Sequence, residues 1–224
     1  MKTNDEVFKE AKQYLKFHKD DFFKSYTKGL SSSEEKVVYF TAGMSGVGKT
    51  ELATFLKEKN PNLLHIDTDE IREFFRPIGY NGQNSDLYQR VASRGFNKLF
   101  RYALKNDFSL IMDSNFANID IQIQNIKSLL KRDYHVNILY LYNEPDVCYE
   151  YATRRELVTH RKVPKDVFIR SNVNSYNTVL AIKDLFEGKV YLDFANVSST
   201  NSGIYENIDS AQLRKLIGER FETE

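Results

Sequence analysis

Residues 43–50 read Gly43-Met44-Ser45-Gly46-Val47-Gly48-Lys49-Thr50. This stretch matches the pattern G-x-x-x-x-G-K-[ST], whose glycines let the backbone curl so that successive N–H groups point at phosphate oxygens beside the positive end of a helix. An apolar run at 37–40 precedes it and a helix-prone run at 51–56 follows it, which is the context that the motif requires. The stretch is therefore predicted to bind a nucleotide, with Lys49 at the β- and γ-phosphates and Thr50 as a hydroxyl ligand of Mg²⁺. A glycine-rich turn with a surface lysine would leave the three glycines unexplained.

The composition sets the outer limits of the interpretation. A chain of 224 residues fits one domain with an extension, and its formal net charge of +1 provides no strong field for long polynucleotides. Cys148 is the one cysteine, so an intrachain disulfide is impossible and packing is its expected role. No run approaches the roughly 18 apolar residues of a membrane span, so we expect a cytoplasmic protein without membrane contact. The four histidines are scattered without metal-ligand spacing, at His18, His65, His135 and His160.

Strand and helix patterns alternate after an N-terminal helical region. Aromatic residues recur at helical spacing between about 5 and 26, and a Gly/Ser segment at 29–33 breaks the pattern. The alternation beyond it predicts βαβ crossovers and a parallel sheet. We therefore predict an α/β protein with a mostly parallel central sheet flanked by helices, an N-terminal helical extension at 1–34 and one domain at 35–224. The predicted strands are 37–40, 63–69, 108–113, 135–142 and 190–194, and the predicted helices end near 60, begin near 85, cover 120–131, 145–157 and 165–186, and begin again near 211.

Carboxylates stand where two predicted strands end. In an open parallel sheet, ligands bind beyond the carboxyl ends of the strands, and this is where Asp67, Asp69 and Asp113 fall. Asp67 and Asp69 are two residues apart, so both side chains would face the same way in an extended segment. A phosphoryl transferase needs such a carboxylate to accept the proton of the attacking hydroxyl. The alternative for each is a helix cap or a turn, and the spacing does not choose between Asp67 and Asp69.

A cluster of arginines, Arg154, Arg155 and Arg161, comes just before the pair Val163-Pro164. Arginine suits planar, multidentate contacts with phosphate, so arginines on a loop between two helices can close over a nucleotide as a lid. The alternative is a solvated basic face. The cluster is the candidate lid of the predicted nucleotide site.

Taken together, these motifs resemble the zeta-toxin family of P-loop kinases over most of the chain. The segments that carry the resemblance are Gly43–Thr50, Ile66–Arg72 with Pro77 after it, Ile111–Ser114 and Arg154–Lys165. Part of the pattern, in Asp69–Arg72, Asp113–Asn115 and Val163-Pro164, is also similar to phage-type polynucleotide 5′-kinases. The resemblance implies a three-layer P-loop kinase fold.

Zeta toxins transfer the γ-phosphate of ATP or GTP to the 3′-hydroxyl of the sugar in UDP-N-acetylglucosamine. The resemblance therefore implies a kinase that uses ATP or GTP with Mg²⁺ and acts on a sugar nucleotide. Lys49 matches the lysine of the phosphate loop, and Asp69 matches the general base of the family. Arg154 and Arg161 match the two lid arginines that contact the triphosphate.

The acceptor side of the site is matched less completely. Arg72 matches a residue that contacts substrate phosphate in polynucleotide kinases, and the same pattern implies substrate contacts for Asp113 and Asn115. Asp113 stands where zeta toxins usually carry Glu. The family also uses an acidic residue on the helix before the third strand to hold the sugar, and the chain has no acid around Asn97.

Three functions are open at this point. The first is a zeta-like kinase for a small metabolite, with an antitoxin as its protein partner, since zeta toxins have an inhibitory partner that blocks the nucleotide site. The second is a polynucleotide 5′-hydroxyl kinase for RNA or DNA ends, which the interleaved acids and bases do not favour. The third is a nucleotide-dependent switch, which would not need Asp69. The N-terminal helices either cover one edge of the sheet or offer a surface to an antitoxin.

Overall fold

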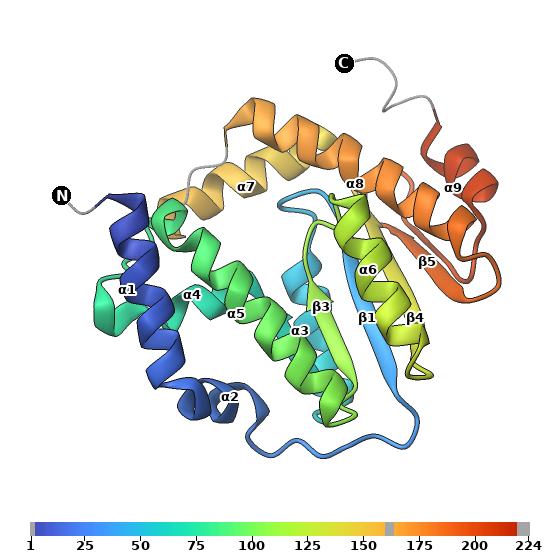
Figure 1. Cartoon of the computed structure of the whole chain (residues 1–224). Coiled ribbons are helices and arrows are strands. Elements are labelled where there is room, and N and C mark those ends of the chain that lie inside the picture. Colours follow the sequence, from blue (N-terminus) through green and yellow to red (C-terminus); the bar gives the residue numbers. More distant parts are fainter. Residues whose placement is uncertain (1–2, 160–163, 219–224) are drawn as a thin grey trace.

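The computed structural model describes residues 3–159 and 164–218. Its strands are β1 Val37–Gly43, β2 Leu64–Asp67, β3 Leu110–Asp113, β4 His135–Tyr142, β5 Val190–Asn196 and β6 Gly203–Tyr205. Its helices are α1 Asn4–Phe17, α2 Lys19–Thr27, α3 Lys49–Lys59, α4 Thr68–Glu73, the 3₁₀ turn η1 Arg76–Ile78, α5 Ser85–Lys105, α6 Ile119–Leu130, α7 Pro145–Thr159, α8 Lys165–Leu185 and α9 Ser210–Ile217. In this part of the chain the strands form one sheet in the order β2-β3-β1-β4-β5-β6, parallel except for β6 (Figure 1). The predicted α/β class with a mostly parallel sheet is confirmed.

β1 lies in the middle of the parallel strands, with β3 on one side and β4 on the other. Phe40 and Thr41 are adjacent on β1, so they point to opposite faces of the sheet, and both are fully buried, as expected of a parallel strand that helices cover on both faces. β2 pairs with β3 so that Asp67 lies opposite Asp113. The phosphate loop leaves the end of β1 directly, so the topology brings the loop and these two acids to the same edge of the sheet.

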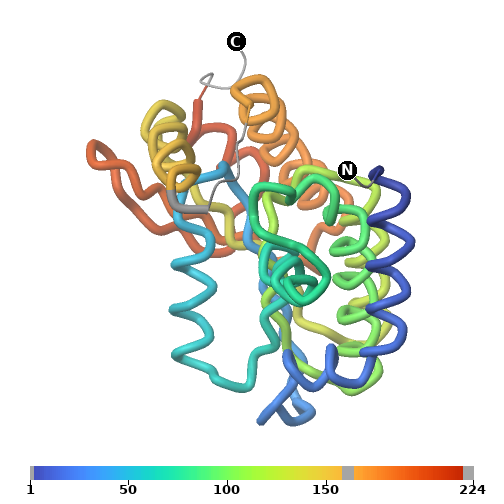
Figure 2. Tube along the Cα trace, turned by 90° about the vertical axis from the view of Figure 1, so that its left-hand side faces the viewer, coloured from blue at the N-terminus to red at the C-terminus, as the bar shows by residue number. Residues whose placement is uncertain are grey.

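Different helices cover the two faces of the sheet. α3 packs on one face against β1 and β3, where Ala53, Leu63 and Ile111 form a small buried cluster. α5, α6 and α8 lie on the other face, over the main hydrophobic core (Figures 1 and 2). α7 lies at the end of the sheet where the parallel strands finish (Figure 1). The strand ends are therefore enclosed by α7 above and by α4 and α5 at the side.

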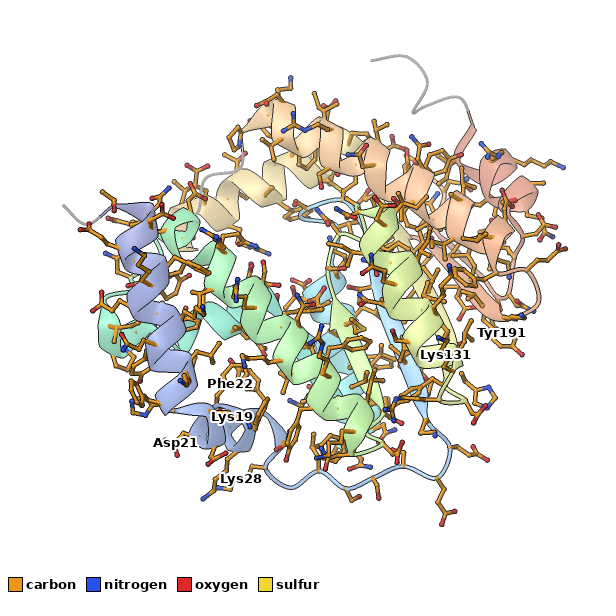
Figure 3. All side chains as sticks on the ribbon, in the orientation of Figure 1. Lys19, Asp21, Phe22, Lys28, Lys131 and Tyr191 are labelled. Carbon is orange, nitrogen blue, oxygen red and sulfur yellow. The ribbon has the colours of Figure 1, made fainter. Side chains whose placement is uncertain are left out.

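The N-terminal helices pack onto the rest of the chain. α1 lies along α5, and α2 reaches the edge strand β2 (Figure 1). Figure 3 shows Phe22 pointing from α2 into the protein, whereas Asp21 and Lys28 point away from it. The Phe22 ring reaches Gly95 of α5, where an added Cβ would lie 3.4 Å from Phe22 Cζ and 2.8 Å from Ile71 Cγ2. The aromatic residues of α1 and α2 thus lie at the β2 edge of the sheet and against α5. The division of the chain into an extension at 1–34 and a domain at 35–224 stays a prediction.

Two expectations about local structure are wrong. β2 ends at Asp67 and α4 begins at Thr68, so Asp69 lies in the first turn of a helix and not in an extended segment. Asp67 and Asp69 therefore do not face the same way along a strand. The sequence pattern also misses β6, because three residues are too few to show a two-residue alternation. None of the helices in the described part of the chain has the length and apolar character that crossing a membrane requires.

Candidate active site

The phosphate loop owes its shape to close backbone contacts at its glycines. Gly43 has a φ of +128°, and a Cβ there would lie 2.3 Å from the carbonyl oxygen of Leu141 on β4. Gly46 has a φ of +81°, and a Cβ there would lie 2.3 Å from the carbonyl oxygen of Cys148 on α7. Both positions combine the left-handed region with a backbone approach that only glycine allows. The loop is thereby held against β4 and α7 at the start of α3.

The Lys49 side chain bends back over the loop. Its amino group donates hydrogen bonds to the carbonyl oxygens of Gly43, at 3.0 Å, and Met44. Burial lowers the pKa of Lys49 to about 8, against the opposing effect of the Asp113 carboxylate. The negative charge of a nucleotide phosphate at the mouth of the loop would stabilise the charged form of Lys49.

Thr50 faces Asp113 across the same opening. Its Oγ1 lies 3.4 Å from Asp113 Oδ2, and Thr41 Oγ1 donates to Asp113 Oδ1 at 2.7 Å. Burial raises the pKa of Asp113, but hydrogen bonds and charges from His65, Thr41 and Lys49 outweigh it and leave the pKa below its usual range. A hydroxyl beside an ionised carboxylate is an oxygen donor set that suits Mg²⁺, which binds few protein ligands and keeps several waters. Among the described residues no cluster of three or more His, Cys, Asp or Glu side chains could hold a metal by itself.

His65 lies behind this carboxylate, and no motif in the sequence pointed to its role. It is buried on β2, with Nε2 3.7 Å from Asp113 Oδ2 and Nδ1 3.2 Å from Glu70 Oε1. Burial lowers its pKa, but the two carboxylates outweigh that effect and raise it to about 9. His65 is therefore a buried cation between two acids. Its alternating position on β2, two residues before Asp67, is the signal that could have placed it on that side of the sheet.

The two acids of the Asp-x-Asp segment have different environments. Asp67 caps α4, because its Oδ1 accepts a hydrogen bond from the backbone N–H of Asp69 at 2.8 Å. Burial and then the Asp69 charge raise the pKa of Asp67 to about 7. Asp69 instead lies between two arginines, with Oδ1 bound by Arg72 and Oδ2 3.1 Å from Arg155. The capping alternative thus applies to Asp67, while Asp69 is the carboxylate that the arginines hold.

Arg72 lies behind Asp69. Its side chain is only 2% exposed, and its guanidinium donates to Gln89 Oε1 through Nη1 and to Asp69 Oδ1 through Nη2. A buried guanidinium needs such partners, since an uncompensated charge is costly to bury. The structure therefore places Arg72 as a support for Asp69, with no exposed surface to offer a substrate phosphate.

On α7 the structure distinguishes between adjacent arginines. Arg154 is exposed and pairs with Glu150 one turn earlier, at 2.5 Å. Arg155 turns to the active site and reaches Asp69. Arg161, the second predicted lid arginine, lies outside the described residues. Of the described arginines in the predicted lid cluster, Arg155 is the one that lines the pocket and contacts Asp69, although the resemblance pointed to Arg154.

These groups surround one pocket of about 570 Å³. It brings together Lys49, Thr50, Asp69, Asp113 and Asn115 of the predicted site, whereas Gly43, Met44, Arg72 and Arg154 are not among its lining residues. The full lining is Ser45, Gly46, Val47, Gly48, Lys49, Thr50, Glu51, Asp67, Thr68, Asp69, Gln89, Asp113, Ser114, Asn115, Asn143, Tyr151 and Arg155. The volume is that of a small-molecule site, and its lining includes Lys49 of the phosphate loop and the Asp69 carboxylate.

Asn115, Gln89 and Tyr151 supply uncharged groups to the pocket. Asn115 is exposed, and its Nδ2 donates to Ser171 Oγ of α8 at 2.5 Å. Sequence reasoning missed Gln89 and Tyr151, because each is one polar position on a long helix and no motif marks it. A phosphate loop, a neighbouring carboxylate and an arginine from α7 around one cavity are the parts needed to transfer a phosphoryl group to a hydroxyl.

Solved structures share this fold at low sequence identity. A structure of the PezAT chromosomal toxin–antitoxin system of Streptococcus pneumoniae has a TM-score of 0.71 at 18% identity, with 100% of this chain and 90% of that chain covered. The AvrRxo1-ORF1:-ORF2 complex has a TM-score of 0.71 at 12% identity, with 90% and 71% covered. The AvrRxo1 complex with ATP has a TM-score of 0.63 at 11% identity, with 96% and 70% covered. Identities this low show a common fold alone.

Sequence comparison identifies the family. No curated protein matches the chain. The model of the zeta toxin family matches residues 20–207, which is well over half of the chain and includes the phosphate loop, α4, β3 and α7. The P-loop kinase fold and the resemblance read from the motifs are thus confirmed, and the chain belongs to the zeta toxin family.

Proposed function

We propose that this zeta-toxin-like P-loop kinase transfers the γ-phosphate of ATP or GTP to a hydroxyl of a small metabolite, a sugar nucleotide of the UDP-N-acetylglucosamine type, with Asp69 as the general base. The observation that carries the proposal is that one pocket contains both the phosphate loop and Asp69. The loop and Lys49 would hold the donor phosphates. The Asp69 carboxylate would take the proton of the acceptor hydroxyl as its oxygen attacks the γ-phosphorus.

We expect Arg155 to contact both the proposed base and the phosphoryl group that is transferred. It contacts Asp69 and lines the pocket, so its guanidinium is within the region where the transferred phosphoryl group would lie. A cation there offsets the charge that develops on the phosphoryl oxygens. We therefore propose Arg155 as the lid arginine that contacts the transferred phosphoryl group, and we keep Arg161 as a further candidate.

Mg²⁺ fits the donor side of the pocket. Thr50 Oγ1 and the ionised Asp113 carboxylate, 3.4 Å apart, would hold it, Asp113 through water, and when bound it would neutralise phosphate charge. This use of Asp113 differs from the substrate contact that the resemblance implied.

The charges near Asp69 favour a sugar hydroxyl over a polynucleotide end. Arg72, the residue expected to meet a substrate phosphate, is buried and occupied by Asp69 and Gln89. Of the described pocket-lining residues, the cations are Lys49 of the phosphate loop and Arg155, which would face the transferred phosphoryl group. The remaining acceptor wall offers acids and neutral amides, which suit hydroxyls better than phosphate.

The test is phosphoryl transfer from γ-labelled ATP or GTP. Purified protein with Mg²⁺ is incubated with UDP-N-acetylglucosamine, with a cell metabolite extract and with a 5′-hydroxyl oligonucleotide, and labelled products are identified. We expect label on a sugar nucleotide and none with Lys49→Ala. Label on the oligonucleotide alone would instead establish the polynucleotide kinase, and binding of nucleotide without any transfer would establish a switch.

We also propose an inhibitory protein partner. The PezAT structure belongs to a toxin–antitoxin system, and the family match makes the same arrangement reasonable for this chain. Growth arrest on expression of the wild type, but not of Lys49→Ala, would support a toxin whose activity needs the phosphate loop. Equal growth arrest by the wild type and by Lys49→Ala would contradict a toxin whose activity needs the phosphate loop.

A further inference from the structure

The side chains of Asp69 and Gln89 are held side by side by one guanidinium. Arg72 donates from its two terminal nitrogens, one to each side chain, and both acceptors line the pocket while Arg72 does not. The terminal nitrogens of a guanidinium form a rigid planar fork, so their two acceptors are set next to each other. Two helices, α4 and α5, are thereby joined into one wall beside the proposed base.

The same contact decides which way the Gln89 amide points. An arginine donates five hydrogens and accepts none, so the atom that faces Arg72 has to be the amide oxygen Oε1. The amide nitrogen Nε2 is then on the other branch of the side chain. Within the described residues its partner is Ser93 Oγ at 3.4 Å, which uses one of its two N–H groups. A second N–H remains to donate to a ligand in the pocket that Gln89 lines.

We infer that Gln89 is a specificity-determining residue for the acceptor, and this inference rests on the proposed function of Asp69. Asp69 takes the proton of the reacting hydroxyl, and Gln89 Nε2 donates a hydrogen bond to an oxygen of the substituent on a neighbouring carbon. The acceptor class is therefore a ring alcohol with an oxygen-bearing substituent on a carbon next to the one that carries the reacting hydroxyl. An isolated primary hydroxyl would leave the amide N–H without a partner.

Other residues of the pocket agree with a polyhydroxyl sugar part of the acceptor. Thr68, Ser114 and Asn115 also line it, and their uncharged groups exchange hydrogen bonds with hydroxyls. The Arg72 side chain is 2% exposed and forms an ion pair with Asp69. These uncharged groups thus suit hydroxyls of the sugar part of the acceptor.

The test combines a change in the acceptor with a change in the enzyme. kcat/KM is measured with Mg²⁺-ATP for UDP-N-acetylglucosamine, for its 4-deoxy analogue and for the analogue without the 2-acetamido group, using wild type and Gln89→Ala. We expect one analogue to be about threefold to tenfold worse with the wild type, the range of a single hydrogen bond. In Gln89→Ala that ratio should fall to about one, because the donor is gone.

Ratios separate contact with the acceptor from support of the base. Loss of the Arg72 contact in Gln89→Ala would slow every acceptor equally and cancel in the ratio. Gln124→Ala, at an exposed glutamine of α6, is the matched control and should keep the wild-type ratios. Ratios that persist in Gln89→Ala, or analogues that equal the parent with the wild type, overturn the inference alone. Absence of label on every sugar nucleotide with the wild type overturns the proposed function and the inference with it.

Discussion

The two walls of the pocket are built in different ways. The donor wall is the phosphate loop 43–50, whose consecutive residues are shaped by glycines that press on the backbone of β4 and α7. The acceptor wall consists of single side chains from two helices, Asp69 of α4 and Gln89 of α5, joined through Arg72, and Arg155 of α7 contacts Asp69. The first depends on backbone geometry and the second on side-chain contacts. Damage to the acceptor wall should therefore spare nucleotide binding, whereas damage to the loop should remove it.

The largest effect on this comparison is expected from Asp69→Asn. An amide cannot accept the hydroxyl proton, so phosphoryl transfer to the acceptor should fall by about a hundredfold to ten-thousandfold. Arg72 would also lose its counter-charge while buried, and the free energy of unfolding should fall by about 2 kcal/mol. Transfer assays and urea unfolding measure the two effects.

Nucleotide binding is the control for Asp69→Asn. The shift in melting temperature that ATP causes should stay as in the wild type, since the two arginines that hold Asp69 come from α4 and α7 and not from the phosphate loop. Loss of that shift would mean that the two walls are not independent.

Gly46→Ala breaks the other wall. A methyl group would meet the Cys148 carbonyl oxygen at 2.3 Å in a left-handed conformation, so we expect a loss of about 3 kcal/mol in unfolding free energy and loss of ATP binding. Gly48→Ala is the matched comparison, because φ there is +104° but the nearest atom, Glu51 Oε2, is 3.8 Å away. It should cost about 1–2 kcal/mol. Equal losses in the two variants would rule out the contact with α7 as the cause.

Arg155→Gln tests the bridge between the walls. Removing a cation that faces the transferred group should lower kcat about a hundredfold, while Arg154→Gln, which breaks an exposed pair with Glu150, should change it less than twofold. Steady-state kinetics of both variants provides the measurement. A larger effect at Arg154 would restore the assignment implied by the resemblance.

The smallest effect should come from His65, which supports the donor wall from below. Its folded pKa of about 9 exceeds the ordinary 6.5, so its stabilisation is complete below pH 6.5 and is lost as pH rises through 9. The loss should be about 1–3 kcal/mol in metal-free buffer. Urea unfolding of wild type and His65→Gln measures it, because the titration of Lys49 is common to both proteins; the difference includes the lowering of the Asp67 pKa by the His65 charge. A constant difference from pH 6.5 to 9 would contradict the buried ion pairs.

Much of the fold was predictable because its signals are local. The loop 43–50 carries its own geometry in three glycines, and alternating apolar strands and amphipathic helices are typical of a parallel sheet. The boundary of α4 was not predictable, since Asp67 acts both as the end of a strand and as a helix cap. β6 pairs with β5, with Phe194 opposite Tyr205, and a strand of three residues is too short to be recognised in the sequence.

The phosphate loop, the order of the helices and of the parallel strands, and the acid at the end of each of β2 and β3 follow from the sequence alone. Only the tertiary structure decided that Asp69 is held by arginines while Asp67 caps a helix, that Arg155 faces the pocket in place of Arg154, and that Gln89 lies beside the proposed base. The physical reason is range. A loop that binds phosphate with its backbone is encoded by neighbours in sequence, whereas Arg155 and Asp69 are 86 residues apart and meet only after α7 has packed across the ends of the strands.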